Sequence, residues 1–215
     1  MSKKDKIRPW DKKKSSTGYR LERFSQNKQI LIVCEGQTEK EYFESFDVVT
    51  LSIKCIDTRG KSKTKLIEVC DEKVIEFGRK GTEFDEIWFV FDMDVEENKK
   101  QHTDFDEAIA KAIKSGYKAA YSNDCFELWF YLHYNYIDQP NLRPFYYGQL
   151  SSLWDVDYKN EGKKLDYCRK IGDWLLTDKK ADQKKAIQRA EKIHDLHQDL
   201  TYSKRNPVTN VYMLV

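Results

Sequence analysis

Three acidic residues follow two apolar runs of the chain, and their positions indicate a shared site. Glu35 ends the run QILIVCE, and Asp92 and Asp94 end the run EIWFVFDMD. Residues two positions apart in an extended segment point to the same side, so both aspartates can face one point. Ligands of parallel sheets bind beyond the carboxyl ends of the strands. We therefore expect the three carboxylates to converge at one edge of a sheet.

Converging carboxylates need a cation, because unit charges about 4 Å apart interact by roughly 4 kcal/mol at an effective dielectric constant of 20. Oxygen ligands of this kind suit Mg²⁺ or Mn²⁺ better than zinc. Glu39 follows Glu35 by one helical turn and adds a fourth carboxylate. With two ions, such a site activates water on one side of a phosphodiester and stabilises the leaving oxygen on the other. An alternative is that Asp92 and Asp94 simply end a strand in solvent. Glu35, directly before Gly36, weighs against it.

Strand and helix patterns alternate along residues 29–138, which predicts an α/β core. Short apolar runs are typical of strands buried in a parallel sheet, and apolar residues at helical spacing lie between them. The predicted strands are 29–35, 48–56, 86–94 and 117–122. The first predicted helix starts at residue 38, and the other three cover 65–79, 104–116 and 122–136. Thr38 and Glu41 have capping-box spacing for the first helix. The alternation predicts a mostly parallel four-stranded sheet covered by helices on both faces.

The regions on either side of this core have different compositions. Residues 1–28 carry ten Lys and Arg against three acids, which predicts a basic, flexible tail drawn to phosphate. The alternative is a disordered tail that only keeps the protein in solution. Residues 139–215 carry mainly helical patterns, which predict a helical extension packed on the core.

The composition excludes several classes of protein. No apolar run reaches the roughly 20 residues that cross a bilayer, and the charged start MSKKDKIRPWDKKK resembles no signal peptide. We therefore expect a cytoplasmic protein without membrane contact. The five cysteines form no C-x-x-C pair, which argues against a disulfide framework and a zinc knuckle. With 40% apolar and 13% aromatic residues, the chain can bury a core and is not fully disordered.

The combination of motifs resembles a known family. ILIVCEGQTEKEYF followed by an Asp-x-Asp strand is similar to a Toprim domain, the metal-binding α/β module of primases, topoisomerases and OLD-type nucleases. Together with YSNDCFELWFYLHY, the later pair Tyr158-Lys159 and the segment NPVTNVY, these motifs resemble the RloB family. The resemblance covers about residues 20–215.

The resemblance implies a Toprim-like fold and a metal-dependent nuclease of prokaryotic antiphage defence, whose gene commonly lies beside that of an AAA-type ATPase. Glu35 matches the Toprim glutamate, and Asp92 and Asp94 match its Asp-x-Asp pair. Glu39 matches a second glutamate of OLD-type nucleases. The chain departs from the family at Asp124, where the family usually has proline.

Glu127 and His133 lie on the helix predicted after the fourth strand, six residues apart and so roughly on opposite faces. For Glu127 we favour a carboxylate of the metal site, or one that positions it, over a structural salt bridge. His133, between aromatic residues, is expected to be a buried core histidine. The aromatic stripe Phe126, Trp129 and Phe130 is expected to pack in the core rather than to stack on bases. The candidate catalytic residues are therefore Glu35, Glu39, Asp92, Asp94 and Glu127.

Six lysines are candidates for contacting nucleic-acid phosphate: Lys61, Lys63, Lys65, Lys159, Lys163 and Lys164. The first three lie in the polar loop predicted after the second strand, and loops at a site edge can approach a backbone. The alternative for them is a mobile surface loop. The last three would flank the same site from the C-terminal extension.

These features favour a metal-dependent nuclease that hydrolyses phosphodiester bonds in DNA or RNA, tRNA included, with two Mg²⁺ or Mn²⁺ ions. Glu35, Asp92 and Asp94 would hold metal, and Glu35 or Glu39 would orient the attacking water. One alternative is a non-catalytic subunit that binds nucleic acid or the ATPase. Another is a nucleotidyltransferase of the primase type. Whether the chain forms a homo-oligomer stays open.

Overall fold

The computed structural model describes residues 28–46, 51–57, 63–94 and 100–215. The predicted basic tail lies outside these residues, apart from Lys28, and so does Lys61. The described part contains a mixed five-stranded sheet flanked by helices, so the predicted α/β class is confirmed. No helix of this part is long and apolar enough to reach across a lipid bilayer.

The sheet has the order β2-β1-β3-β4-β5, and its first four strands are the predicted ones. They are parallel to one another, and Ile32 of β1 lies opposite Cys55 of β2 and Trp88 of β3. The apolar runs form strands because both faces of a parallel sheet are buried; five consecutive residues of β1 and of β3 are buried. Their bounds are β1 Lys28–Cys34, β2 Leu51–Asp57, β3 Glu86–Asp92 and β4 Lys118–Asn123.

The fifth strand was not predicted, and it corrects the four-stranded sheet. β5 (Val208–Thr209) comes from the extension that was predicted to be helical, and it pairs antiparallel with β4. The hydroxyl groups of Ser122 and Thr209 lie 2.8 Å apart, and the Asn210 side chain accepts a hydrogen bond from the backbone N–H of Tyr121. The C-terminal segment therefore completes the sheet at its β4 edge.

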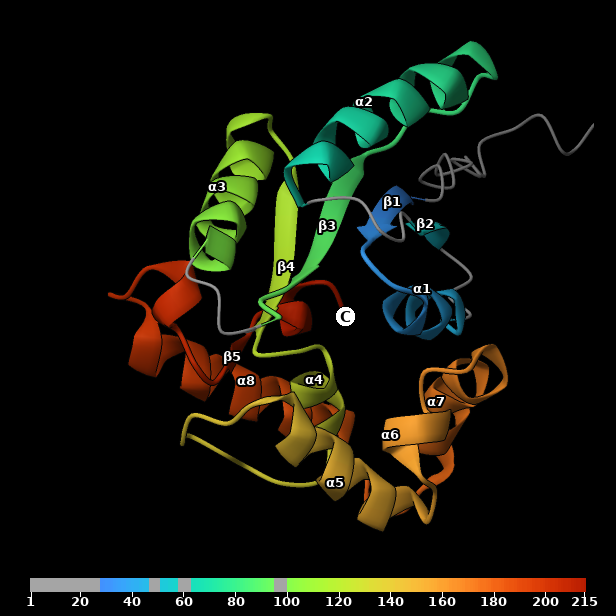
Figure 1. The fold of residues 1–215 in the computed structure, drawn as a ribbon. Coiled ribbons are helices and arrows are strands. Elements are labelled where there is room, and N and C mark those ends of the chain that lie inside the picture. Colours follow the sequence, from blue (N-terminus) through green and yellow to red (C-terminus); the bar gives the residue numbers. More distant parts are fainter. Residues whose placement is uncertain (1–27, 47–50, 58–62, 95–99) are drawn as a thin grey trace, which may run out of the picture.

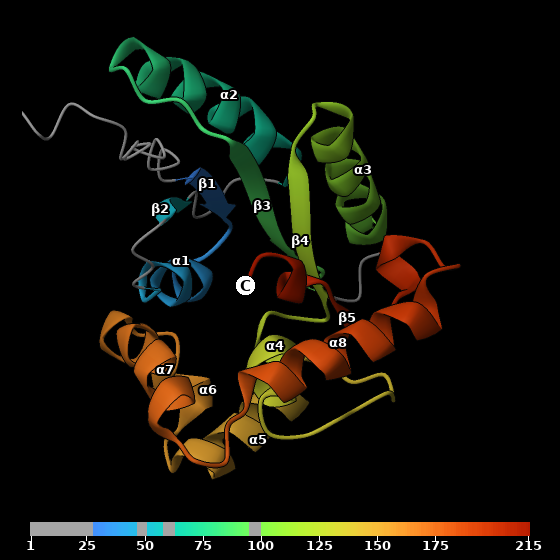
Figure 2. The ribbon, with the colours of Figure 1, turned by 180° about the vertical axis from the view of Figure 1, so that it is seen from behind.

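Helices surround the sheet in two groups (Figures 1 and 2). α2 and α3 lie side by side at one end of the molecule, whereas α4 to α8 gather beyond the carboxyl ends of the strands. α1 packs against α7 of the second group. The α-helices are α1 Gln37–Glu44, α2 Lys63–Arg79, α3 Lys100–Lys114, α4 Glu127–Leu132, α5 Arg143–Trp154, α6 Tyr158–Glu161, α7 Leu165–Thr177 and α8 Gln183–His197. Two short 3₁₀ helices flank β5, namely η2 Tyr202–Lys204 and η3 Val211–Met213.

The aromatic residues of α4 form the centre of the core between the sheet and these helices. Phe126, Trp129 and Phe130 are fully buried, which confirms that the stripe packs in the core. Trp129 Nε1 donates a hydrogen bond of 2.8 Å to the hydroxyl group of Tyr42 in α1. This bond and the packed rings link α4 to α1, and both helices begin at the carboxyl edge of the sheet.

Candidate functional site

The five predicted acids all lie at the carboxyl edge of the sheet. Glu35 directly follows β1, Glu39 lies in the first turn of α1, and Asp92 is the last residue of β3. Asp94 follows two residues later, and Glu127 is the first residue of α4, after β4. Because β1, β3 and β4 are parallel neighbours, their ends bring these acids to one place.

The ends of β3 and β4 are tied together by the backbone. The N–H of Met93 donates to the carbonyl group of Ser122, and the N–H of Asp94 donates to that of Asp124. Asp94 has a left-handed backbone with φ 52°, which aspartate tolerates better than most residues. These contacts hold the Asp-x-Asp segment against the start of the α4 region.

Three acids of the cluster are buried and carry an oxygen without a hydrogen-bond partner among the described residues. These atoms are Glu39 Oε2, Asp92 Oδ1 and Glu127 Oε2. Burial raises the pKa of Asp92 well above its usual value, and repulsion by Glu39 and Glu127 raises it further. The pKa of Glu39 is raised by the same two causes, burial first and then repulsion by Glu127. Buried acceptors without a donor cost about 1–3 kcal/mol each, so this part of the site is short of positive charge.

Glu39 is close to the backbone because Gly36 precedes α1. The helix begins at Gln37 with Gly36 as its N-cap, so the predicted capping box at Thr38 is wrong. Glu39 Oε2 lies only 2.6 Å from the position that a Cβ atom on residue 36 would occupy. Any side chain at this position would therefore displace the Glu39 carboxylate from the cluster.

The two outer acids, Glu35 and Asp94, are paired with basic side chains. Lys63 was predicted near the site as a phosphate contact, whereas Arg143 was not predicted. Lys63 Nζ lies 2.8 Å from both carboxylate oxygens of Glu35 and 3.9 Å from Asp94 Oδ2. Arg143 forms an ion pair with Asp94. Burial raises the pKa of Glu35, and the ammonium group of Lys63 offsets only part of this effect. The outer carboxylates are thus neutralised by two cations of the chain itself.

Asp124 explains how Arg143 reaches this position. The Asp124 carboxylate accepts a hydrogen bond of 2.7 Å from the backbone N–H of Arg143, the first residue of α5. Asp124 is buried, and its hydrogen bond holds the start of α5 beside Asp94. No sequence signal of Arg143 itself indicated this role.

The innermost acid, Glu127, is held by two residues of the α6 region. Its Oε1 atom accepts a hydrogen bond of 3.0 Å from the hydroxyl group of Tyr158, and Lys163 Nζ lies 2.5 Å away. Burial acts to raise the pKa of Glu127, but the charge of Lys163 outweighs it, and the pKa is lowered. In Lys163, burial acts to lower the pKa, but attraction by Glu127 and Glu39 outweighs it. The structure therefore combines the two interpretations of Glu127, since the residue makes a salt bridge within the acidic cluster.

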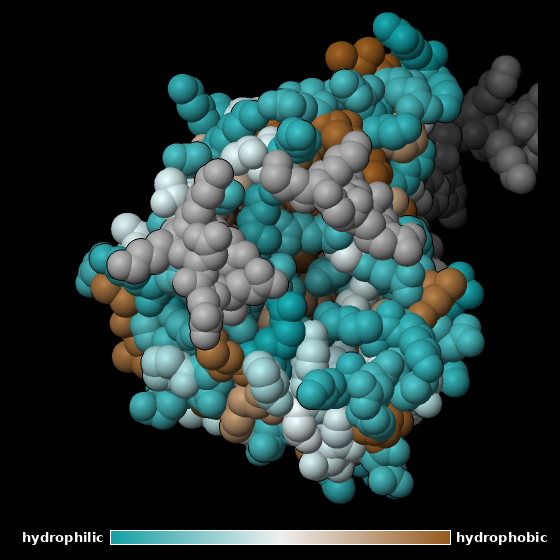
Figure 3. Space-filling view, viewed as in Figure 1, coloured by the Kyte–Doolittle hydropathy of each residue, from teal (hydrophilic) through white to brown (hydrophobic). Residues whose placement is uncertain are grey.

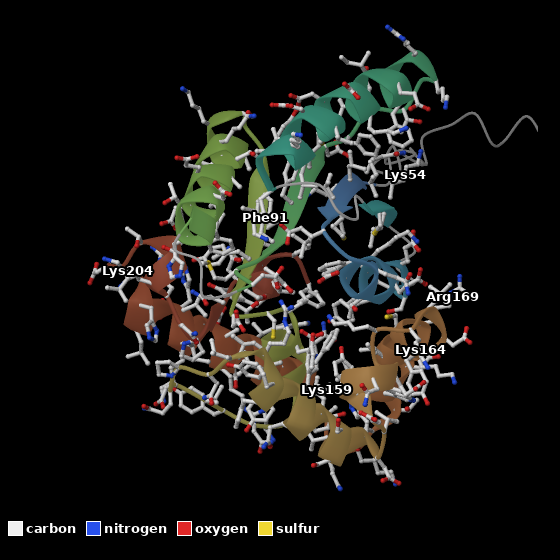
Figure 4. The ribbon with its side chains drawn as sticks, in the orientation of Figure 1. Lys54, Phe91, Lys159, Lys164, Arg169 and Lys204 are labelled. Atoms are coloured by element: carbon white, nitrogen blue, oxygen red, sulfur yellow. The ribbon has the colours of Figure 1, made fainter. Side chains whose placement is uncertain are left out.

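The predicted phosphate-contacting lysines are divided by the structure. Lys63 and Lys65 were expected in a loop, which is wrong, because α2 begins at Lys63. Lys63 and Lys163 join the acids, whereas Lys65 and Lys159 are exposed and Lys164 pairs with Glu161 at 2.7 Å. Figure 4 shows Lys159 and Lys164 on the α6–α7 side of the molecule. The face that contains the carboxyl edge is mostly hydrophilic and is hollowed near its centre (Figure 3).

The donor chemistry of the cluster fits Mg²⁺ or Mn²⁺, since every candidate ligand is a carboxylate oxygen and three of these oxygens are buried without a partner. In the arrangement described, no three His, Cys, Asp or Glu side chains of the described residues form a group that could hold a metal ion. Lys63 and Arg143 form ion pairs with the outer carboxylates in this arrangement. A metal ion would have to displace these two side chains.

His133 lies at the other end of α4 and is buried, as predicted. Its Nδ1 lies 3.0 Å from the carbonyl oxygen of Trp129, so Nδ1 carries the proton and donates. Burial lowers the pKa of His133 to about 4, and the ring is neutral at pH 7. With Tyr42 and Phe46 it lines a cavity of about 780 Å³ between α1, α7 and α8. Glu127 and His133 therefore belong to different sites, as their spacing predicted.

Comparison with known proteins gives one match. No curated protein and no solved structure matches the chain significantly. A family model described as RloB-like protein matches residues 30–215, which include the acids of the cluster and the residues that hold them. The chain therefore belongs to the RloB-like protein family.

Proposed function

We propose that the protein is a Mg²⁺- or Mn²⁺-dependent nuclease with a Toprim-like site that hydrolyses phosphodiester bonds in DNA or RNA. The observation that carries the proposal is the convergence of five carboxylates at the carboxyl edge of three parallel strands. Carboxylates that are buried close together, with too few hydrogen-bond donors or cations, destabilise a fold when they have only a structural role. Such clusters are typical of sites that bind a cation and use its charge.

Glu35, Asp92 and Asp94 are the residues that would hold the ion, with Glu39 beside them. A bound divalent ion supplies positive charge to the phosphate and a water molecule of lowered pKa. Lys63 and Arg143 would have to leave their carboxylates for an ion to bind there, and each would then offer a cation to a phosphate oxygen at the same edge. Glu35 or Glu39 would orient the attacking water.

Two further parts of the proposal concern the fold and the biological role of the protein. The parallel order of the first four strands, with a glutamate after β1 and Asp-x-Asp at the end of β3, supports a Toprim-like fold. A role in antiphage defence together with an AAA-type ATPase, which the resemblance of the motifs to the RloB family implies, is part of the same proposal. The nucleic acid that is cut, tRNA included, is to be found by experiment.

The proposal is tested with the purified protein, DNA, total RNA and tRNA as substrates, in Mn²⁺, in Mg²⁺ and in EDTA. We expect cleavage that depends on the ion, with or without an ATPase partner. Loss of a residue that only supports a metal ligand lowers activity by about 10–100-fold. Asp92→Ala and Glu35→Ala should each lower the cleavage rate by more than this. Asp85→Asn, at the opposite end of the β3 region, is the matched control and should leave cleavage unchanged. Activity that persists in both alanine variants contradicts the assignment.

One observation favours a second candidate function. Because Lys63 and Arg143 already neutralise the outer acids, the cluster is also consistent with a non-catalytic subunit that binds nucleic acid or the ATPase. Such a subunit binds its partner without cleavage under any metal condition, which filter binding and co-purification would show. Incorporation of labelled nucleotide would instead indicate a nucleotidyltransferase of the primase type.

A further inference from the structure

We propose that Lys163 is a built-in cation of the inner part of the site, so that the protein takes one divalent ion rather than two. The ion binds at Glu35, Asp92 and Asp94, while Lys163 stays on Glu127. This inference rests on the proposed metal-dependent function, and it deepens it by assigning the number of ions. It also replaces the two-ion arrangement expected from the sequence.

Lys163 is held in place by its contact with Glu127. Its ammonium group lies 2.5 Å from Glu127 Oε1, which also accepts the hydrogen bond of Tyr158. Between these two residues of the α6 region lies Gly162, and a Cβ atom there would come within 2.3 Å of the Tyr158 ring. The close packing of Gly162 on Tyr158 therefore directs the chain so that Lys163 meets the same oxygen. The side chain of Lys163 is 42% exposed, but its ammonium group is held against the fully buried carboxylate of Glu127.

The inner and outer acids differ in how far their side chains are exposed. The Glu127 side chain has no exposed surface, whereas 17% of the Glu35 side chain and 40% of the Asp94 side chain are exposed. Mg²⁺ loses its water reluctantly and usually keeps several water molecules in protein sites. A hydrated ion can therefore reach the outer acids, but it reaches Glu127 only if Lys163 leaves.

One divalent ion matches the positive charge that Lys63 and Arg143 already bring to the outer acids. Lys63 and Arg143 together carry two positive charges on the outer acids. One divalent ion that displaces both side chains brings the same charge, so the net charge of the cluster does not change. Glu39 and Asp92 also feel the attraction of Lys163, which therefore supplies the charge that a second ion would otherwise bring. A second ion would have to displace Lys163 as well.

The test is the number of Mn²⁺ ions bound, measured by calorimetric titration and by the electron paramagnetic resonance of free Mn²⁺. We expect the wild-type protein and Lys163→Arg to bind one ion. Lys163→Met should bind two ions, because the inner acids then lack their cation. Lys170→Met is the matched control, since Lys170 is an exposed lysine of α7 beside Tyr167, and it should bind one ion.

Thermal unfolding in EDTA and in Mn²⁺ gives a second measurement. Lys163→Met should unfold at a lower temperature than the wild type in EDTA and should gain more from Mn²⁺. If Lys163→Met does not fold, the double variant Glu127→Gln/Lys163→Met removes both charges, and we expect it to fold and to bind one ion. Two ions on the wild type, no ion on the wild type, or an unchanged single ion on a folded Lys163→Met protein each overturn the inference. One ion without cleavage of any nucleic acid contradicts only the proposed function.

Discussion

Replacing Asp92 by asparagine should stabilise the metal-free protein and abolish its response to metal. Asp92 is buried with 7% of its surface exposed, and its Oδ1 has no hydrogen-bond partner within the described part of the chain. Burial and the charges of Glu39 and Glu127 oppose its ionisation. The substitution keeps the shape of the side chain and removes the charge.

The size of the effect follows from this environment. An unpaired buried polar group costs about 1–3 kcal/mol, and a charged group costs more. We therefore expect Asp92→Asn to raise the free energy of unfolding by about 1–3 kcal/mol at pH 7 in EDTA. For a chain of this length, this corresponds to an increase of the melting temperature of roughly 2–12 °C.

The assay is urea or thermal unfolding of both proteins, followed by circular dichroism, in EDTA and in Mn²⁺. An ion at 100 times its dissociation constant should stabilise the wild-type protein by about 2.7 kcal/mol. The ion should leave the stability of Asp92→Asn almost unchanged. In Mn²⁺ the difference in free energy of unfolding between the two proteins should therefore vanish or change sign. Glu83→Gln, at an exposed position before the same strand, is the control and should change stability by less than about 0.5 kcal/mol.

One result would refute this reasoning. If Asp92→Asn is less stable than the wild type in EDTA, and Mn²⁺ stabilises neither protein, Asp92 has a structural donor and the acids are not short of a cation. The metal site, and with it the proposed nuclease, would then have to be abandoned.

Three further predictions concern residues around the site. The pKa of His133 falls from 6.5 to about 4 on folding. Between these pH values the unfolded chain therefore binds more protons than the folded protein. The free energy of unfolding of the wild type falls by up to about 3 kcal/mol as the pH drops through this window. His133→Gln should remove this loss, as urea unfolding at each pH would show; an unchanged pH profile contradicts it. Tyr158→Phe removes a donor from buried Glu127 and should destabilise the protein by about 1–3 kcal/mol in urea unfolding; no change would mean that Lys163 alone satisfies Glu127. Asn210→Ala breaks hydrogen bonds to the backbone of β4 and should cost about 1–3 kcal/mol. Hydrogen exchange should rise in β4, and unchanged protection would refute this.

The positions of the acids could be predicted from the sequence because they depend on local patterns. A short apolar run followed by an acid indicates a strand end, and parallel strands place their ends at one edge. Glu35, Asp92 and Asp94 needed no more than this. Glu39 followed from its place one helical turn after Glu35, and Glu127 from its place on the helix predicted after the fourth strand.

The cations of the site were predicted only in part. Lys63 and Lys163 were expected near the site as phosphate contacts, but their ion pairs with Glu35 and Glu127 were not. Arg143 was missed, because it reaches Asp94 through a hydrogen bond of its backbone to Asp124, 19 positions earlier. Such pairs depend on how helices pack in three dimensions, which hydrophobic periodicity does not specify. β5 was missed for a related reason, because two residues are too few to show an alternating pattern.

The pairing of β4 with β5 has a consequence for the protein while it is being made. Thr209 lies 87 positions after its partner Ser122, and a ribosome that adds about 5–20 residues per second needs roughly 4–17 s to cover that interval. During this time β4 lacks its outer neighbour, and the segment leading to Glu127 lacks its anchor. A chain that has not yet reached residue 210 therefore lacks the strand that pairs with Ser122 and Asn123, four residues before Glu127.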